Sequence, residues 1–163
     1  MEGSDLLKYL LERCIKQVYA RPRSEREMRI YLARLLSRRV HKLKEKDKFI
    51  DEVIEGLKKK KYLDDDKFIA WWVQERLYFK PRGSRALVSE LRAKGVASER
   101  IDEYFQVHPL DEQEFARRAL KSSVWRRRDF SDPQIRKKAL SYLARKGFSY
   151  EISKNAIEEL DKT

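Results

Sequence analysis

The stretch that decides the fold is 63–96, LDDDKFIAWWVQERLYFKPRGSRALVSELRAKGV, because parts of it recur later in the chain. Its opening, a leucine followed by an acidic tract and a phenylalanine, returns at residues 110–115. Its end, 89–96, shares its serine, leucine, lysine and glycine with residues 141–148. A repeat with a period of about 50 residues is typical of stacked helical modules, each of which packs on its neighbours.

The stretch predicts two helices and leads into a third. The acidic tract 64–66 stands where a helix begins, since carboxylates cap free amides and offset the positive end of the helix dipole. The Lys80-Pro81 pair ends this helix, because proline disfavours helical geometry in the residue before it. Ser84 is expected to cap the second helix, and Gly95 is expected to close it.

The apolar spacing also predicts the core of this module. Phe68 and Trp72 stand one turn apart on the inward face of the first helix, and Leu91 lies on that of the second. We expect all three side chains to be buried. Gly95 and its repeat equivalent Gly147 are expected to have positive φ angles, since glycine adopts the left-handed conformation that commonly ends a helix.

An ordered set of residues runs through the central and last repeats. It consists of the acidic cap, Phe68-Ile69, Trp72-Val73, Arg76, Pro81-Arg82, Ser84, Leu91, Lys94-Gly95-Val96 and Leu143-Ala144-Arg145-Lys146-Gly147-Phe148. This set resembles the central and C-terminal three-helix repeats of the RecX family of recombinase regulators, and the resemblance extends over most of the chain. The first repeat departs from it, because residues 37–44 continue where the later repeats have lysine, glycine and a hydrophobic residue.

We therefore predict an all-α fold, an elongated, curved array of three tandem three-helix repeats of the solenoid type. The first repeat comprises residues 1–62 and has a longer second helix or loop, the central repeat comprises 63–109, and the C-terminal repeat comprises 110–163. In the first repeat, Ser24 and Glu27 have the spacing of a capping box, in which each side chain accepts a hydrogen bond from the other residue's backbone amide.

The composition suits thin modules and an anionic partner. Of the 163 residues, 41% are hydrophobic and 40% are charged, whereas the charged fraction of globular domains is about 25%. The net charge of +12 favours nucleic acid as the partner, then an acidic protein or a membrane surface. The first and last repeats carry the excess, and the charges of the central repeat cancel. Solvated helix faces without any partner are the alternative.

Basic residues near the ends of helices are the candidate partner contacts. Four consecutive lysines close the third helix, where they either offset the helix dipole or contact phosphates. These are Lys58, Lys59, Lys60 and Lys61. In the central repeat, the exit of the first helix carries a basic edge. This edge consists of Arg76, Lys80, Arg82 and Arg85.

The last repeat adds two more basic groups. Arg126, Arg127 and Arg128 lie between Trp125 and Phe130, so they could hold phosphates while an aromatic ring stacks on a base. Burial of both aromatic side chains against a neighbouring helix is the alternative, and the slightly favoured one. Three further cations begin the next helix, an unfavourable place for positive charge unless an anion is near. These are Arg136, Lys137 and Lys138.

Signatures of catalysis or of a cofactor site are absent from the sequence. The five glycines are scattered and form neither a phosphate-binding loop nor a dinucleotide motif. One cysteine, Cys14, and two histidines, His41 and His108, cannot build a usual zinc site. We therefore predict a binding protein that is not an enzyme and needs no metal or cofactor. A single cysteine also allows no internal disulfide, which fits the cytoplasm, and the charged N-terminal helix is too short to span a membrane.

The resemblance implies a specific function. It implies a monomeric bacterial regulator that binds in the groove of the RecA recombinase filament on single-stranded DNA. There it inhibits or modulates the ATPase, strand-exchange and co-protease activities of RecA, in DNA repair, homologous recombination and the SOS response. Two alternatives stay open on the residues alone: a single-stranded nucleic-acid-binding protein acting by itself, and a helical-repeat scaffold that does not bind DNA.

Overall fold

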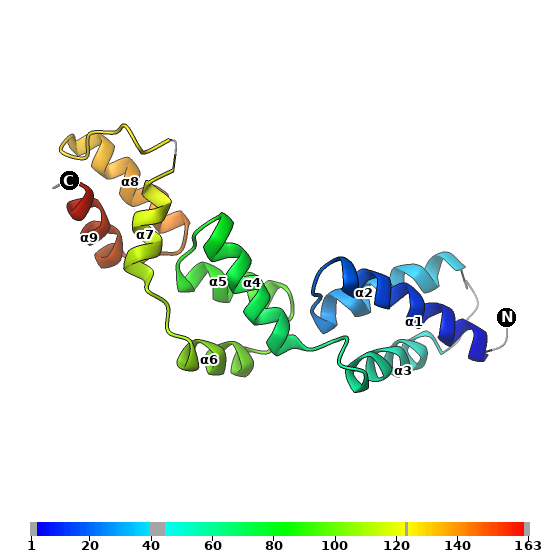
Figure 1. The fold of residues 1–163 in the computed structure, drawn as a ribbon. Helices are drawn as coiled ribbons and strands as arrows, with labels where there is room; N and C mark the ends of the chain where they lie inside the picture. The colour runs from blue at the N-terminus through cyan, green and yellow to red at the C-terminus, as the bar shows by residue number, and fades with distance from the viewer. Residues whose placement is uncertain (1–2, 40–44, 123, 162–163) are drawn as a thin grey trace. The chain divides into compact units, whose positions relative to one another are not determined.

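The computed structural model describes residues 3–39, 45–122 and 124–161 (Figure 1). Within these ranges the chain forms nine α-helices and no strand, which confirms the predicted all-α fold. The helices are α1 (Gly3–Ala20), α2 (Glu25–Arg39), α3 (Lys46–Lys59), α4 (Asp65–Phe79), α5 (Ser84–Ala93), α6 (Ser98–Val107), α7 (Glu112–Leu120), α8 (Pro133–Arg145) and α9 (Tyr150–Asp161). The predicted lengthening of the first repeat falls on 37–44, of which residues 40–44 lie outside the described residues, as does His41.

The chain divides into two compact units. The first contains Met1–Trp71 and Arg92–Arg100, and the second contains Trp72–Leu91 and Ile101–Thr163. This division passes through the central helices α4, α5 and α6, so the repeat boundaries at residues 62 and 109 stay a prediction. Among the described helices, none combines the length and the apolar character that crossing a membrane requires.

In the first unit, α1, α2 and α3 enclose one apolar core. Its fully buried side chains include Leu10, Cys14, Leu32, Leu36, Ile54 and Leu57. The capping box at the start of α2 is confirmed. Ser24 Oγ accepts a hydrogen bond from the Glu27 amide at 3.2 Å, and Glu27 Oε2 accepts one from the Ser24 amide at 3.3 Å. Burial raises the pKa of the Cys14 thiol to about 12, so this thiol stays protonated and unreactive.

In the second unit, α7, α8 and α9 enclose another core, and α9 packs against both other helices (Figure 1). Trp125 and Phe130, which flank the arginine run, belong to this core, and their rings stack with 6.4 Å between centroids. Trp125 also packs against Tyr142 of α8. Burial is therefore the observed role of these two aromatic side chains, and neither ring is available to stack on a base.

The predicted burial of the central helices is right at two positions and wrong at one. Phe68 and Leu91 are fully buried. Trp72 is only half-buried, because its indole needs a polar partner at the rim of the core. Its Nε1 donates to Glu90 Oε2 at 2.9 Å, and the guanidinium of Arg76 lies over the ring, 4.4 Å from its centroid.

The expected helix ends are correct except for the cap of α5. The carbonyl of Gly83 accepts the first helical hydrogen bonds, from the amides of residues 86 and 87, so Gly83 is the N-cap. Ser84, expected in that role, lies inside the helix and donates its hydroxyl to Glu112 instead. The positive φ angles predicted for Gly95 and Gly147 are confirmed, at 80° and 90°.

Lys61 adopts the left-handed conformation that normally belongs to glycine, with φ of 57°, just beyond the end of α3. Lys61→Gly is therefore expected to raise the free energy of unfolding by about 0.5 to 1 kcal/mol. Glycine relieves the left-handed strain, and this gain is larger than the loss that comes from the greater entropy of the unfolded chain. Lys60→Gly is the matched control, because Lys60 has an ordinary φ of −84°. Denaturant titration should show opposite signs for the two variants, and the same sign would contradict the strain at Lys61.

Candidate partner-binding interface

Each unit contains one copy of the same packing arrangement, which we call a joint. In both copies, a loop with a proline-arginine pair leads into one helix and packs against the lysine-glycine turn that ends another. The first joint, in the first unit, is formed by residues 21–27 and 94–95. The second joint, in the second unit, is formed by residues 80–86 and 146–147.

A hydrogen bond to the lysine carbonyl closes each joint. In the first, Ser24 Oγ donates to the Lys94 carbonyl oxygen at 2.7 Å. In the second, the Gly83 amide donates to the Lys146 carbonyl oxygen at 2.9 Å. The second joint is so tight that a β-carbon on Gly83 or Gly147 would collide with backbone atoms of the opposite segment. Glycine at these two positions is therefore a requirement of the packing.

The first joint neutralises its own cations. Glu27 Oε1 accepts hydrogen bonds from Arg21 Nη2 at 3.0 Å and from Lys94 Nζ at 2.9 Å. Burial alone would raise the pKa of Glu27, but these two hydrogen bonds and the charges behind them outweigh burial and lower it to about 2. The basic residues of this joint thus have an internal carboxylate partner.

Glu27→Gln is expected to lower the free energy of unfolding by about 1.5 to 3 kcal/mol at neutral pH, because it removes charged hydrogen bonds. The pKa of Glu27 falls from 4.5 to about 2 on folding, so its contribution is complete above pH 4.5 and disappears as the pH drops toward 2. Denaturation across this range should therefore show a shallower loss of stability in the variant. Parallel pH profiles for variant and wild type would disprove the role of Glu27.

The second joint repeats these cations without the carboxylate. Counted from the proline of each loop, the two basic residues recur as Lys80 and Arg82. The lysine of the turn recurs as Lys146, but Ala86 stands at the position that Glu27 occupies in the first joint. The second joint is therefore the more positive of the two.

Lys146 is a partly buried cation of the second joint. Burial, followed by repulsion from Arg82 and Lys80, lowers the pKa of its ammonium group. Its Nζ lies over the ring of Tyr142, 5.2 Å from the centroid, and no carboxylate in the described part of the chain pairs with it. The positive charge of Lys146 is thus held at a place where it opposes folding.

Glu90 compensates part of the charge on the other side of the loop. Its Oε2 accepts hydrogen bonds from Arg76 Nε at 2.7 Å and from Trp72 Nε1 at 2.9 Å. Arg82 Nε lies 3.6 Å from Glu90 Oε1, and within the described residues this buried nitrogen has no hydrogen-bond partner. Arg76, predicted as a partner contact, is therefore engaged inside the protein, whereas Lys80 is exposed.

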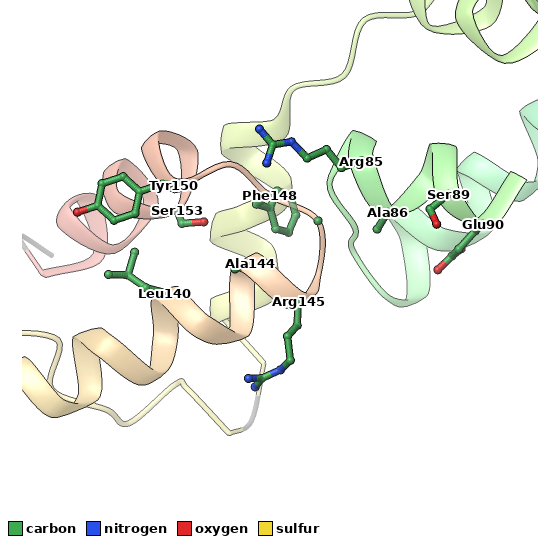
Figure 2. A pocket seen from close by; sticks show the side chains of 11 residues that line it. Arg85, Ala86, Ser89, Glu90, Leu140, Ala144, Arg145, Phe148, Tyr150 and Ser153 are labelled. Carbon is green, nitrogen blue, oxygen red and sulfur yellow. The ribbon is translucent and has the colours of Figure 1, made fainter. Parts of the chain in front are cut away.

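An open groove of about 610 Å³ lies beside the second joint, between α5 and the turn from α8 to α9 (Figure 2). Figure 2 shows Arg85 and Arg145 on opposite sides of Phe148, which is buried beneath the groove. Both arginines are exposed. The groove thus has an apolar floor with two arginines and Glu90 along its edges, and the arginines favour a partner that carries acidic groups.

The lysine run of the first unit combines internal and exposed charges. Lys58 Nζ lies 3.3 Å from both Glu25 Oε2 and Glu55 Oε1, which gives it a structural role. The other three lysines are exposed. They are Lys59, Lys60 and Lys61. The run therefore keeps three of its four predicted contact residues available to a partner.

The basic residues of the last repeat also include both exposed side chains and one that is paired inside the protein. Three exposed arginines project from the surface loop, although the aromatic residues beside them are buried. They are Arg126, Arg127 and Arg128. Arg136 has its anionic neighbours inside the protein, since its Nη atoms lie 3.2 Å from Glu158 and 3.8 Å from Asp161. Lys137 and Lys138 are exposed.

The structure adds three residues that the sequence interpretation did not select: Lys146, Tyr78 and Phe79. Tyr78 and Phe79 are 74% and 67% exposed at the end of α4, directly before Lys80. Alignment of the two joints around their prolines would have identified Lys146, because it reveals alanine in place of glutamate at residue 86. No sequence signal distinguishes the exposed ring of Phe79 from the buried ring of Phe68.

Comparison with known proteins gives a consistent set of relatives. The model of the RecX second three-helix domain matches residues 64–104. The regulatory protein RecX of Bacillus velezensis is 28% identical over 162 residues, which cover 99% of this chain and 59% of that protein. The RecX protein of Bacillus pumilus is 32% identical over 111 residues, covering 68% of this chain and 42% of that protein. The chain thus spans less than two thirds of the length of these curated relatives.

A solved structure shares the fold. The crystal structure of RecX from Lactobacillus salivarius aligns with 98% of this chain and 99% of its own, with a TM-score of 0.73 and 18% sequence identity. At that identity the likeness establishes the helical-repeat fold and does not by itself carry function over.

Proposed function

Because this chain belongs to the RecX family, we propose that it regulates a RecA recombinase by binding in the groove of the RecA filament on single-stranded DNA. Bound there, it restrains ATP turnover, strand exchange and co-protease activity. The protein acts as a monomer in the bacterial cytoplasm, and the proposal assigns it no catalytic step and no cofactor.

The observation that carries this proposal is the match of nearly the whole chain to proteins named as regulators, together with a helical-repeat fold. Stacked helical modules provide long surfaces for a macromolecular partner. The exposed cations support an anionic one, because they lie in both units: Lys59, Lys60 and Lys61 in the first, and Lys80, Arg85, Arg126, Arg127, Arg128, Lys137 and Lys138 in the second.

Co-sedimentation with RecA filaments tests the proposal directly. The protein should pellet with filaments formed on single-stranded DNA in the presence of a slowly hydrolysed ATP analogue, and should remain in solution without them. In parallel, DNA-dependent ATP hydrolysis by RecA should fall as the protein is added. A protein that leaves both sedimentation and hydrolysis unchanged is not a regulator of the filament.

Replacement of Arg126, Arg127 and Arg128 together by alanine is expected to weaken binding to the filament and to reduce its dependence on salt, because exposed ionic contacts are screened by salt. Folding should survive, since changes at exposed positions usually alter stability by less than about 0.5 kcal/mol. Binding is measured by sedimentation at increasing salt, and circular dichroism checks the fold.

The same triple variant should also be measured on naked single-stranded DNA. A loss on the filament supports a regulatory contact through the arginine run. A loss confined to naked DNA would make these arginines irrelevant to regulation, and no loss on either ligand would leave them as a solvated surface.

A further inference from the structure

We propose that the second joint binds a single strand of DNA directly, with backbone phosphates at Lys80, Arg82 and Lys146 and with bases stacked on Tyr78 and Phe79. This inference rests on the proposed function and deepens it by naming the ligand of one site. The contact itself requires no recombinase, so it can be tested on DNA alone.

The two joints differ in how they balance the charge of their lysine. Both carry the same cations around a lysine-glycine turn, but only the first supplies a carboxylate, Glu27, within hydrogen-bond distance of its lysine. In the second, Ala86 takes that position, and Lys146 is repelled by the nearby charges of Arg82 and Lys80 instead. Arg82 has Glu90 at 3.6 Å, so a phosphate placed among these three cations would supply the negative charge that Lys80 and Lys146 lack within the described residues.

Two exposed aromatic rings lie at the end of α4, directly before Lys80. Tyr78 and Phe79 are in edge-to-face contact, with 4.8 Å between their centroids, and most of each side chain is exposed. Arg118 Nη2 lies 3.4 Å from the carbonyl oxygen of Tyr78, so a further cation stands beside them. Aromatic platforms next to a positively charged track are the arrangement that binds single strands without sequence preference.

These rings also decide between possible anions. An acidic peptide would satisfy the cations but would leave two large apolar surfaces in water. A DNA duplex keeps its bases stacked on one another, so it cannot place them on Tyr78 and Phe79. A single strand uses both features at once, because each nucleotide offers a phosphate and an unstacked base.

Helix dipoles offer a purely structural explanation for the cations, since Lys80 and Lys146 follow the C-terminal ends of α4 and α8. That explanation requires the dipoles to stabilise the charged lysine. At Lys146, burial and repulsion from Arg82 and Lys80 act against that stabilisation, because both lower the pKa of its ammonium group. The two helix ends together carry only about one negative charge, whereas three cations lie at this joint.

The test uses the whole chain, fluorescence anisotropy and three probes: a labelled oligodeoxythymidylate, an abasic oligonucleotide of equal length, and polyglutamate as a competitor. The charge variant Lys80→Gln with Lys146→Gln should bind both oligonucleotides more weakly. Its salt slope should decrease by about 0.7 for each lost phosphate contact. The ring variant Tyr78→Ala with Phe79→Ala should lose roughly 5- to 100-fold in affinity for oligodeoxythymidylate and little for the abasic probe.

Two controls carry equal chemical changes elsewhere. Lys8→Gln with Lys16→Gln removes two exposed charges from α1, and Tyr19→Ala removes a ring that is 75% exposed. Both controls should bind oligodeoxythymidylate more tightly than the corresponding site variants. Removal of the Lys146 charge should leave thermal stability unchanged or higher, which separates lost binding from misfolding.

Three results would overturn the inference: no binding of wild type to oligodeoxythymidylate, equal affinity for the abasic probe, or displacement by polyglutamate at equal charge concentration. The last would identify an acidic protein as the ligand. If one of these results occurs while the protein still pellets with filaments, the single-strand site at the second joint is disproved and the proposed function is not. If the single-strand site is confirmed but the protein does not bind filaments, the proposed function is disproved and the site is retained.

Discussion

Phe68→Ala is expected to lower the free energy of unfolding by about 3 to 5 kcal/mol. The side chain of Phe68 is fully buried, and its ring lies 5.9 Å from that of Trp71. Truncation to alanine removes apolar surface from the core and also leaves a cavity that neighbouring helices cannot fill completely. Chemical denaturation followed by circular dichroism measures the loss.

Phe79→Ala is the matched control, because the same change is made at a side chain that is 67% exposed. Its effect on stability should stay below about 0.5 kcal/mol. The two variants also separate folding from binding, since only Phe79 belongs to the proposed strand site. A stable Phe68→Ala variant with unchanged melting would remove Phe68 from the core.

Gly147→Ala is expected to lower the free energy of unfolding by about 2 to 4 kcal/mol, the sum of left-handed strain and steric overlap. Gly147 has φ of 90°, and a β-carbon there would overlap the backbone of Ala86. Gly83→Ala should cost about 1 to 3 kcal/mol through overlap with Gly147. Thermal and chemical denaturation give both values.

Gly56→Ala provides a control of opposite sign. Gly56 lies inside α3, and its added β-carbon would meet Leu11 at an ordinary 3.5 Å. Alanine there should raise stability by about 0.5 to 1 kcal/mol, because it is the better helix former. If Gly147→Ala proved as harmless as Gly56→Ala, the second joint would not be closed as described.

Local sequence rules predicted the elements well because each rests on neighbouring residues. Asp65 begins α4, the Lys80-Pro81 pair follows its end, and Gly95 and Gly147 adopt the backbone conformation that only glycine takes without strain. The burial of Phe68 followed from helical spacing alone.

The errors concern side chains whose partners lie far away in the sequence. Trp72 is half-buried because its indole N–H donates a hydrogen bond to Glu90, and Ser84 lies outside the cap of α5 with its hydroxyl donating to Glu112. The candidate site was affected in the same way. Lys80 and Lys146 lie far apart in the sequence, and only the folded chain joins their segments, through the hydrogen bond from the Gly83 amide to the Lys146 carbonyl oxygen.

Ala86 affects both the stability of the folded state and the charge that the second joint offers to a ligand. A glutamate there would let the second joint neutralise itself, as Glu27 does for the first, and the folded state would be more stable. The same carboxylate would also act as a built-in competitor for any phosphate. If a phosphate binds the second joint as proposed, Ala86 exchanges some stability of the folded state for affinity, and the bound phosphate resolves this local frustration.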